Sequence, residues 1–492
     1  MHHPFPTLSR RVLVMAAAAA ALAGCATPPA LDAASVLARA EAAMGGSQLK
    51  SLRIAGKGTG ATFGQAYEPG LPWPRLNVSQ FVRVMDYEAG AMRQETAVSR
   101  SEPNGGGAVP LMGMGEQRAV GVVQGDFAWN MVGPAQVAAP VAHSGRMHDL
   151  WTSPHGVLKA AARSKAVAGT RNVEGKTYTT LSFRQPGAFE ATAFLNAEGL
   201  VERVESRQPH AVMGDTESVI SYTGYKSHGG VQFPSRITQR MGGSEIWSIE
   251  VTEVQPGVAS GIAATDAVKQ FKETVASQKV TDGVWFLAGG SHNSVLIEMK
   301  DYLMLVEAPL YDGRSAAVIA EARKLVPGKP IRFAVNSHHH FDHAGGLRTA
   351  AAEGIALVTS AAAKPWFEKT LANPNSIVPD ALARSGRQAM VESVNGSRTF
   401  SDGARTVNVL DIGGSVHARG FLMVHLPAEK LLIEADAYTP GAPGTPPSNP
   451  PNANNVNLLE NIERQKLAVE RILPLHGRVV PLAELAMAAG RR

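Results

Sequence analysis

The densest group of chemically capable side chains in this sequence lies at residues 338–343, which read His-His-His-Phe-Asp-His. His338, His340, Asp342 and His343 stand at positions i, i+2, i+4 and i+5, so a loop could turn them toward one metal ion or two adjacent ones. This mixed nitrogen and oxygen set suits zinc, with iron or manganese as substitutes. An apolar run at residues 331–335 predicts a short buried strand before the motif, and an alanine-rich helical pattern follows it.

Three more potential ligands stand at predicted strand ends farther along the chain. His417 precedes the apolar run 421–426, Asp436 follows the run 431–435, and His476 lies before a glycine in Leu-Pro-Leu-His-Gly. Strands of an α/β sheet deliver the residues at their ends to one edge, which is where such folds bind ligands. We therefore expect these side chains to join the motif in one metal centre.

With this ordered ligand set, residues 281–492 resemble the metallo-β-lactamase fold superfamily in its dinuclear form. The resemblance implies an α/β fold, an αββα sandwich, and two bound zinc ions. It places His338, His340 and His417 on the first ion and Asp342, His343 and His476 on the second, with Asp436 bridging both. His339 is the variable position of the motif, expected beside the ligands or toward solvent.

A dinuclear zinc centre predicts metal-assisted hydrolysis. Two ions about 3.5–4 Å apart share a water, lower its pKa toward neutrality and polarise a carbonyl or phosphoryl oxygen. Asp342 would orient this nucleophile. Zinc β-lactamases carry cysteine or serine where this chain has Asp436, and aspartate there is similar to glyoxalase-type thioesterases, lactonases and phosphodiesterases. Glu307 stands near the family's Asp-Thr-Gly turn, and we expect it to brace the ligand loop.

Other residues near the motif have competing interpretations. Tyr438 is a possible substrate contact or a tyrosine that closes a strand end, and His292 is a residue of the metal edge or of a turn. Residues 439–455, rich in Pro, Gly and Asn, cannot form a helix or central strand and are expected to be a pocket wall or lid. His425 alternates within a strand and is expected to be an ordinary packed or surface histidine.

The N-terminus has the layout of an export signal. Residues 1–24 carry Arg10 and Arg11 ahead of an apolar stretch too short to span a membrane as a mature helix. Leu-Ala-Gly-Cys at residues 22–25 resembles the bacterial lipobox, which implies lipidation of Cys25, with residues 25–31 as a tether to the outer membrane facing the periplasm. Cys25 is also the single cysteine, so a disulfide framework within the chain is excluded.

Residues 32–258 alternate between polar and apolar side chains in short runs separated by Gly, Pro and Asn, which predicts an antiparallel meander. A helix is expected at residues 32–44, another within 147–163, and a linker helix within 259–280. The segment resembles LolA-type lipoprotein carriers, which implies a half-barrel closed by helices around an apolar cavity. This domain would take up an acyl chain or serve as a spacer.

The sequence as a whole predicts an envelope-anchored dinuclear zinc hydrolase for a lactone, ester, thioester or amide. A β-lactamase is one alternative, and a lipid or lipoprotein carrier with a structural metal domain is another. The net charge of +5 is spread over a chain with 18% charged residues, which predicts no nucleic-acid partner. Expected partners are a small or acyl-bearing substrate and the membrane that holds the anchor.

Overall fold

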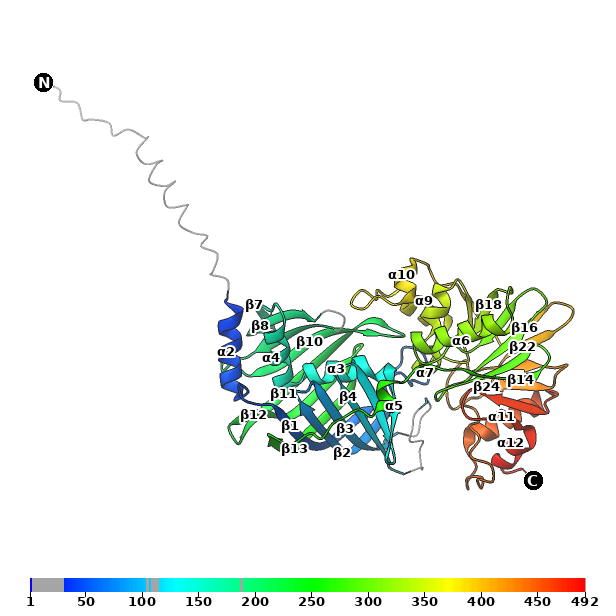
Figure 1. Ribbon diagram of the computed structural model, residues 1–492, viewed down its shortest axis with the longest axis horizontal. Helices are drawn as coiled ribbons and strands as arrows, with labels where there is room; N and C mark the ends of the chain where they lie inside the picture. The colour runs from blue at the N-terminus through cyan, green and yellow to red at the C-terminus, as the bar shows by residue number, and fades with distance from the viewer. Residues whose placement is uncertain (2–30, 103–105, 108–114, 186–188, 492) are drawn as a thin grey trace.

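The computed structural model describes residue 1 and residues 31–102, 106–107, 115–185 and 189–491. These residues form a β-rich N-terminal domain and an α/β C-terminal domain that lie side by side along the long axis of the molecule (Figure 1). Apart from Met1, the predicted signal segment lies outside the described residues, and so does Cys25. Within the described ranges, every helix is too short or too polar to cross a lipid bilayer.

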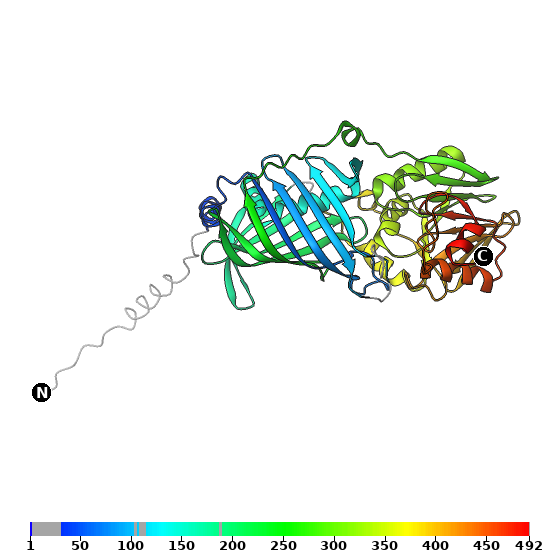
Figure 2. The same cartoon turned by 90° about the horizontal axis from the view of Figure 1, so that it is seen from below.

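One antiparallel 13-stranded sheet makes up most of the N-terminal domain (Figure 2). The sheet runs in the order β6-β5-β4-β3-β2-β1-β13-β12-β11-β10-β9-β8-β7. Strand β1 joins its two halves, because it pairs with both β2 and β13. The predicted antiparallel architecture is thereby confirmed. The strands are β1 (Ser51–Ala61), β2 (Arg75–Asp86), β3 (Ala91–Arg100), β4 (Gln117–Gln124), β5 (Phe127–Val132), β6 (Ala135–Ala138), β7 (Val167–Val173), β8 (Lys176–Gln185), β9 (Phe189–Leu195), β10 (Val201–His210), β11 (Gly214–His228), β12 (Val231–Met241) and β13 (Ser244–Pro256).

Three helices, α2 (Ala33–Met44), α3 (His143–Trp151) and α4 (Pro154–Arg163), pack on this sheet, and the short η1 (Pro140–Ala142) precedes α3. The Asp32 side chain caps the first turn of α2, and Gly45 ends the helix with a φ of +64° that favours glycine. Side chains of the helices and of both halves of the sheet share one apolar core, which includes Met44, Trp151 and Phe233. Burial of this shared core holds the curved sheet and its helices together.

The connection between the domains differs from the predicted linker helix. Only α5 (Asp266–Lys269) is helical, and β14 (Ala276–Thr281) is an edge strand that pairs with β15 of the C-terminal domain. The backbone groups of β14 find partners in the neighbouring strand, which outweighs the modest helical tendency of this polar segment. The C-terminal sheets therefore begin at Ala276 rather than after a helix.

Two sheets packed face to face form the centre of the C-terminal domain. Helices α6, α8, α9 and α10 share a second core with the outer face of the first sheet, and α11 and α12 pack at the second sheet, which gives the predicted αββα order. The first sheet contains β14, β15 (Val284–Ala288), β16 (Ser294–Glu298), β17 (Leu303–Val306), β18 (Ile331–Val335), β19 (Ala356–Ser360) and β20 (Val391–Val394). The second contains β21 (Ser397–Ser401), β22 (Thr406–Asp411), β23 (Leu422–Leu426), β24 (Leu431–Glu434), β25 (Arg471–Pro474) and β26 (Val480–Pro481). The helices are α6 (Asp312–Leu325), α7 (Phe341–Ala344), α8 (Leu347–Ala352), α9 (Lys364–Ala372), α10 (Ala381–Ser385), α11 (Ala453–Arg464) and α12 (Leu482–Ala488).

Candidate metal centre

The sheets bring the predicted ligands to one edge of the C-terminal domain. The motif follows β18 and continues into α7, and His417 precedes β23. Strands β24 and β25 are parallel neighbours, so Asp436 and His476, which follow them, leave the sheet on the same side. All seven predicted ligands meet there in two adjacent groups.

The first group contains His338, His340, His417 and Asp436. Nε2 of His338 lies 2.9 Å from Nδ1 of His340 and 3.1 Å from Nε2 of His417. Oδ2 of Asp436 lies 2.9 Å from the same His417 nitrogen. Three ring nitrogens and one carboxylate oxygen thus converge on one point.

The second group contains Asp342, His343, His476 and His292. Nε2 of His343 and Nε2 of His476 are 3.2 Å apart, and each lies 2.8 Å from Oδ1 of Asp436. The two oxygens of Asp436 therefore face different groups, as the predicted bridging role requires.

The donor set fits divalent metal ions of the zinc type. Oδ1 of Asp436 is buried and accepts no hydrogen bond of acceptable geometry, although two ring nitrogens lie beside it. The two nitrogens lie 3.2 Å apart and 2.8 Å from this oxygen, close enough for one cation to bind all three atoms. Imidazole nitrogens with two carboxylates form a set that zinc, iron and manganese accept.

The charges of the isolated side chains in the first group also favour a cation. Burial lowers the pKa of His338 and of His340 well below the usual range, and neighbouring histidines add to this effect, so both rings stay neutral. Burial opposes ionisation of Asp436, but His343 and His417 outweigh it and hold its pKa well below the usual range. Neutral imidazoles and ionised carboxylates are the forms that bind metals. In the second group the carboxylates of Asp436 and Asp342 outweigh burial and raise the pKa of His343 well above its usual range, so a metal ion bound there would displace a proton.

A buried carboxylate braces the ligand loop from behind. Glu307 is fully buried with a φ of +73° and lies 3.0 Å from Nδ1 of His343. It accepts hydrogen bonds from Ser337 Oγ at 2.6 Å and Asn336 Nδ2 at 3.1 Å. The contact with Nδ1 fixes the tautomer of His343 so that Nε2 faces the centre. Glu307 thus has the bracing position that the sequence predicted.

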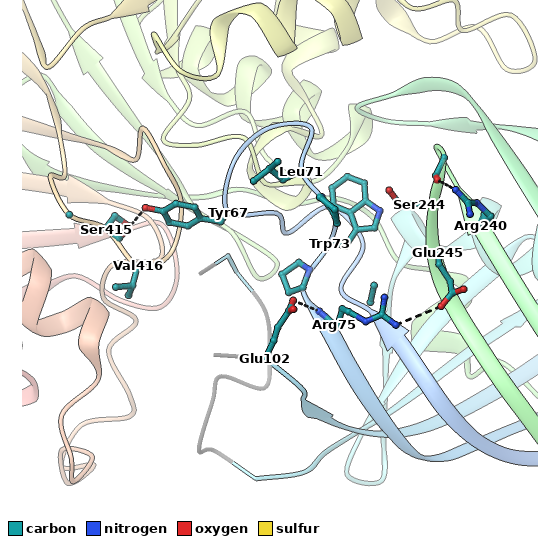
Figure 3. Close-up of a pocket in the computed structure, with 15 residues that line it drawn as sticks. Tyr67, Leu71, Trp73, Arg75, Glu102, Arg240, Ser244, Glu245, Ser415 and Val416 are labelled. Carbon is teal, nitrogen blue, oxygen red and sulfur yellow. Dashed lines mark hydrogen bonds and ion pairs between the residues drawn. The ribbon is translucent and has the colours of Figure 1, made fainter. Parts of the chain in front are cut away.

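A strap of the N-terminal domain, residues 62–74 between β1 and β2, supplies further contacts. Gln65 Nε2 donates to Asp342 Oδ1 at 2.8 Å, and the Ala66 carbonyl accepts from His340 Nε2 at 2.9 Å. The second contact leaves Nδ1 of His340 free to face the first group. The hydroxyl of Tyr67 donates to the Ser415 carbonyl at 3.0 Å (Figure 3), and Ser415 is two residues before His417 in the sequence.

Two cavities lie between the domains beside this strap. One, of about 890 Å³, is lined by strap residues such as Trp73, by strand residues such as Arg75 and Glu245, and by Ser415 and Val416 (Figure 3). The other, of about 1000 Å³, reaches the candidate ligands Asp342, His417, Asp436 and His476. The second cavity is therefore the one in which a substrate can meet the metal centre.

His292 is the metal-edge residue that the sequence left undecided. Its Nε2 lies 3.2 Å from Asp342 Oδ2, and burial lowers its pKa to about 4. The buried Arg314 donates to the His292 carbonyl at 3.2 Å and so holds the turn in place. His292 can thus act as a further ligand or as an orienting partner of Asp342.

The remaining sequence predictions have different outcomes. His339 is buried with Nε2 2.8 Å from the Ala66 carbonyl, so it lies beside the ligands and away from solvent. His425 is an ordinary packed histidine, with Nε2 2.9 Å from the Ala468 carbonyl. Tyr438 is 5% exposed within the apolar core, and its role as a substrate contact stays a prediction. Thr439 and Asn452, from the predicted lid segment, line the larger cavity.

Comparison with known proteins gives the class of the C-terminal domain. Residues 287–476 match the model of the metallo-β-lactamase superfamily, so this domain belongs to that superfamily, as its ligand motif predicted. Similar solved structures include a metallo-β-lactamase from Pontibacter korlensis, with 16% identity, a TM-score of 0.34, and coverage of 44% of this chain and 98% of that one. The mono-zinc form of the metallo-β-lactamase FIM-1 from Pseudomonas aeruginosa has 22% identity, a TM-score of 0.34 and coverage of 44% and 95%. A metallo-β-lactamase from Hirschia baltica has 20% identity, a TM-score of 0.33 and coverage of 44% and 97%.

Proposed function

We propose that this protein is a dinuclear zinc hydrolase that acts on a carbonyl compound such as a lactone, ester, thioester or amide. The observation that carries the proposal is the position of Asp436, whose two oxygens face two separate groups of histidines, with Oδ2 2.9 Å from His417 Nε2 and Oδ1 2.8 Å from His343 Nε2. A single ion would leave one of these groups without a partner. The presence of two groups of ligands therefore favours two ions.

Zinc ions held in the two groups would lower the pKa of a shared water and polarise the carbonyl oxygen of the substrate. The chain itself positions the reactants. Asp342 is fixed on one oxygen by Gln65 and on the other by His292, so its carboxylate has one orientation from which it can hold a water molecule. The cavity beside it has room for the carbonyl group of a substrate next to Asp342.

We propose the location from the sequence alone: an exported protein tethered to the bacterial envelope through lipid on Cys25 and facing the periplasm. Metabolic labelling with a fatty acid tests this part separately from the enzymology. Label in the wild type and its loss in Cys25→Ser are expected. Equal label in both proteins would contradict the anchor.

The function is tested by hydrolysis of lactones, esters, thioesters and β-lactams by protein lacking residues 1–25. Turnover that a chelator removes and zinc restores is expected, with the preferred bond naming the substrate. Turnover should fall by a factor of 10² or more (about 3 kcal/mol) in Asp436→Ala. It should stay at the wild-type level in Asp126→Ala, a variant of an exposed turn. Full turnover with full metal content in Asp436→Ala would overturn the bridging role. Preference for β-lactams would make the protein a β-lactamase instead.

A further inference from the structure

The larger interdomain cavity has walls from both domains. Its lining includes the candidate metal ligands Asp342, His417, Asp436 and His476. Its volume of about 1000 Å³ is at the upper end of the range of small-molecule sites. Asn452, Asn454 and Asn455 contribute amide groups on the C-terminal side. A ligand that fills the cavity would therefore touch the candidate metal ligands with one part and the remaining lining with another.

Another part of the lining is apolar, and the N-terminal domain supplies much of it. Phe63 of the strap and Phe341 of the ligand motif pack edge to face with ring centroids 5.3 Å apart. The ring of His210 also belongs to this cluster, with its centroid 4.8 Å from that of the Phe341 ring. Val141 and Val212 add further apolar surface to the lining. The apolar surface thus begins one residue from the ligand Asp342.

His210 does not interrupt this apolar surface with a charge. Burial lowers the pKa of its ring to about 4, so the ring is neutral at the pH of most cellular compartments. Its Nδ1 accepts hydrogen bonds from the backbone N–H groups of Val212 and Met213, both at 3.2 Å. The ring therefore serves as the cap of the turn between β10 and β11 and as part of the wall.

We infer that this cavity binds an apolar acyl or alkyl arm of the substrate, and that the N-terminal domain is the part of the protein that selects it. The inference rests on the proposed hydrolase function for the reacting end of the substrate. The polar end would lie at the metal ligands and the apolar arm would extend along Phe63 and Val212. A carbonyl compound with a medium-length hydrocarbon chain has this distribution of polarity.

Binding of neutral alcohols tests the inference without any turnover. Calorimetric titration of 1-butanol, 1-hexanol and 1-octanol is run on zinc-loaded and on chelator-treated protein. Each added pair of methylene groups should tighten binding by about tenfold in both samples, because burial of each methylene is favourable. Equal affinities along the series would overturn the inference. Because no bond is cleaved, a failed hydrolysis assay would leave this result standing.

A matched pair of variants places the bound chain. Val141 lines the cavity and is 50% exposed, whereas Val167 is a 68% exposed valine on β7 at the far edge of the sheet. Both positions reach water, so an aspartate should not unfold either protein, which circular dichroism checks. Val141→Asp should weaken 1-octanol binding by tenfold or more and 1-butanol binding far less, and Val167→Asp should match the wild type. An unchanged 1-octanol affinity in folded Val141→Asp would contradict this site.

Discussion

The side-chain amide of Gln65 donates a hydrogen bond to Oδ1 of Asp342 at 2.8 Å, although the two residues are 277 positions apart. Asp342 is a candidate ligand of the second metal, and Gln65 belongs to the strap of the N-terminal domain. The N-terminal domain therefore takes part in the geometry of the candidate metal centre as well as in its cavity.

Replacement of Gln65 by leucine should free the Asp342 carboxylate to rotate. Since partners of metal ligands commonly contribute 10–100-fold to affinity or activity, we expect kcat to fall by about tenfold and the weaker-bound zinc to be lost at lower chelator concentrations. Gln117→Leu, at another position in the cavity wall, is the control and should retain the wild-type zinc affinity. Chelator titration followed by atomic emission measures the zinc retained. Identical titration curves for Gln65→Leu and the wild type would show that the strap does not position Asp342.

Removal of the Glu307 side chain should damage stability and metal binding together. Glu307→Ala leaves Ser337 Oγ, Asn336 Nδ2 and His343 Nδ1 without their buried partner. We expect a loss of about 3–5 kcal/mol in the free energy of unfolding, since each unsatisfied buried group costs about 1–3 kcal/mol. Urea denaturation measures the loss.

Glu353→Ala is the control for Glu307, because its ion pair with Arg323 is exposed on both sides. Exposed pairs contribute at most about 1 kcal/mol, so this variant should unfold close to the wild type. If Glu307→Ala were as stable as Glu353→Ala, this would contradict the claim that Glu307 stabilises the ligand loop.

The N-terminal domain should become less stable in mild acid. Burial lowers the pKa of His155 to about 4, against an ordinary value of about 6.5, while its Nε2 lies 3.0 Å from the Gln232 carbonyl. Between these two values the unfolded chain binds a proton that the folded protein does not, so stability rises with pH through this window and falls as pH drops from 6.5 toward 4.

His155→Gln keeps a donor for the Gln232 carbonyl and does not titrate. Between pH 7 and pH 4.5 the free energy of unfolding should decrease in both proteins. The decrease should be about 2 kcal/mol smaller in His155→Gln than in the wild type. Urea denaturation at both pH values gives the difference. Equal losses in the two proteins would mean that His155 is protonated in the folded state.

The candidate metal ligands, which the structure brings together, could be picked out from the sequence because each stands in a short local pattern. His338, His340, Asp342 and His343 lie within six residues, and His417, Asp436 and His476 stand next to apolar runs that are strands. The helix Ala33–Met44 could also be predicted from the sequence, because Asp32 and Gly45 are typical residues for its two ends. Each of these signals is contained in a few neighbouring residues.

The strap could not be predicted in the same way. Gly64, Gln65 and Ala66 form part of an irregular segment with no periodicity, and their partners His340 and Asp342 lie in the other domain. The linker prediction was wrong because pairing of Ala276–Thr281 with β15 depends on a neighbouring strand that local helix propensity does not register. His292 was ambiguous for a related reason, since the buried Arg314 that holds its turn lies on α6.

Anomalous diffraction at the zinc edge, from crystals of protein purified with zinc, tests the central claim most directly. Two peaks about 3.5–4 Å apart are expected, one among His338, His340 and His417 and the other beside Asp342, His343 and His476, with Asp436 between them. A single peak, or peaks away from these two groups, would contradict the dinuclear centre.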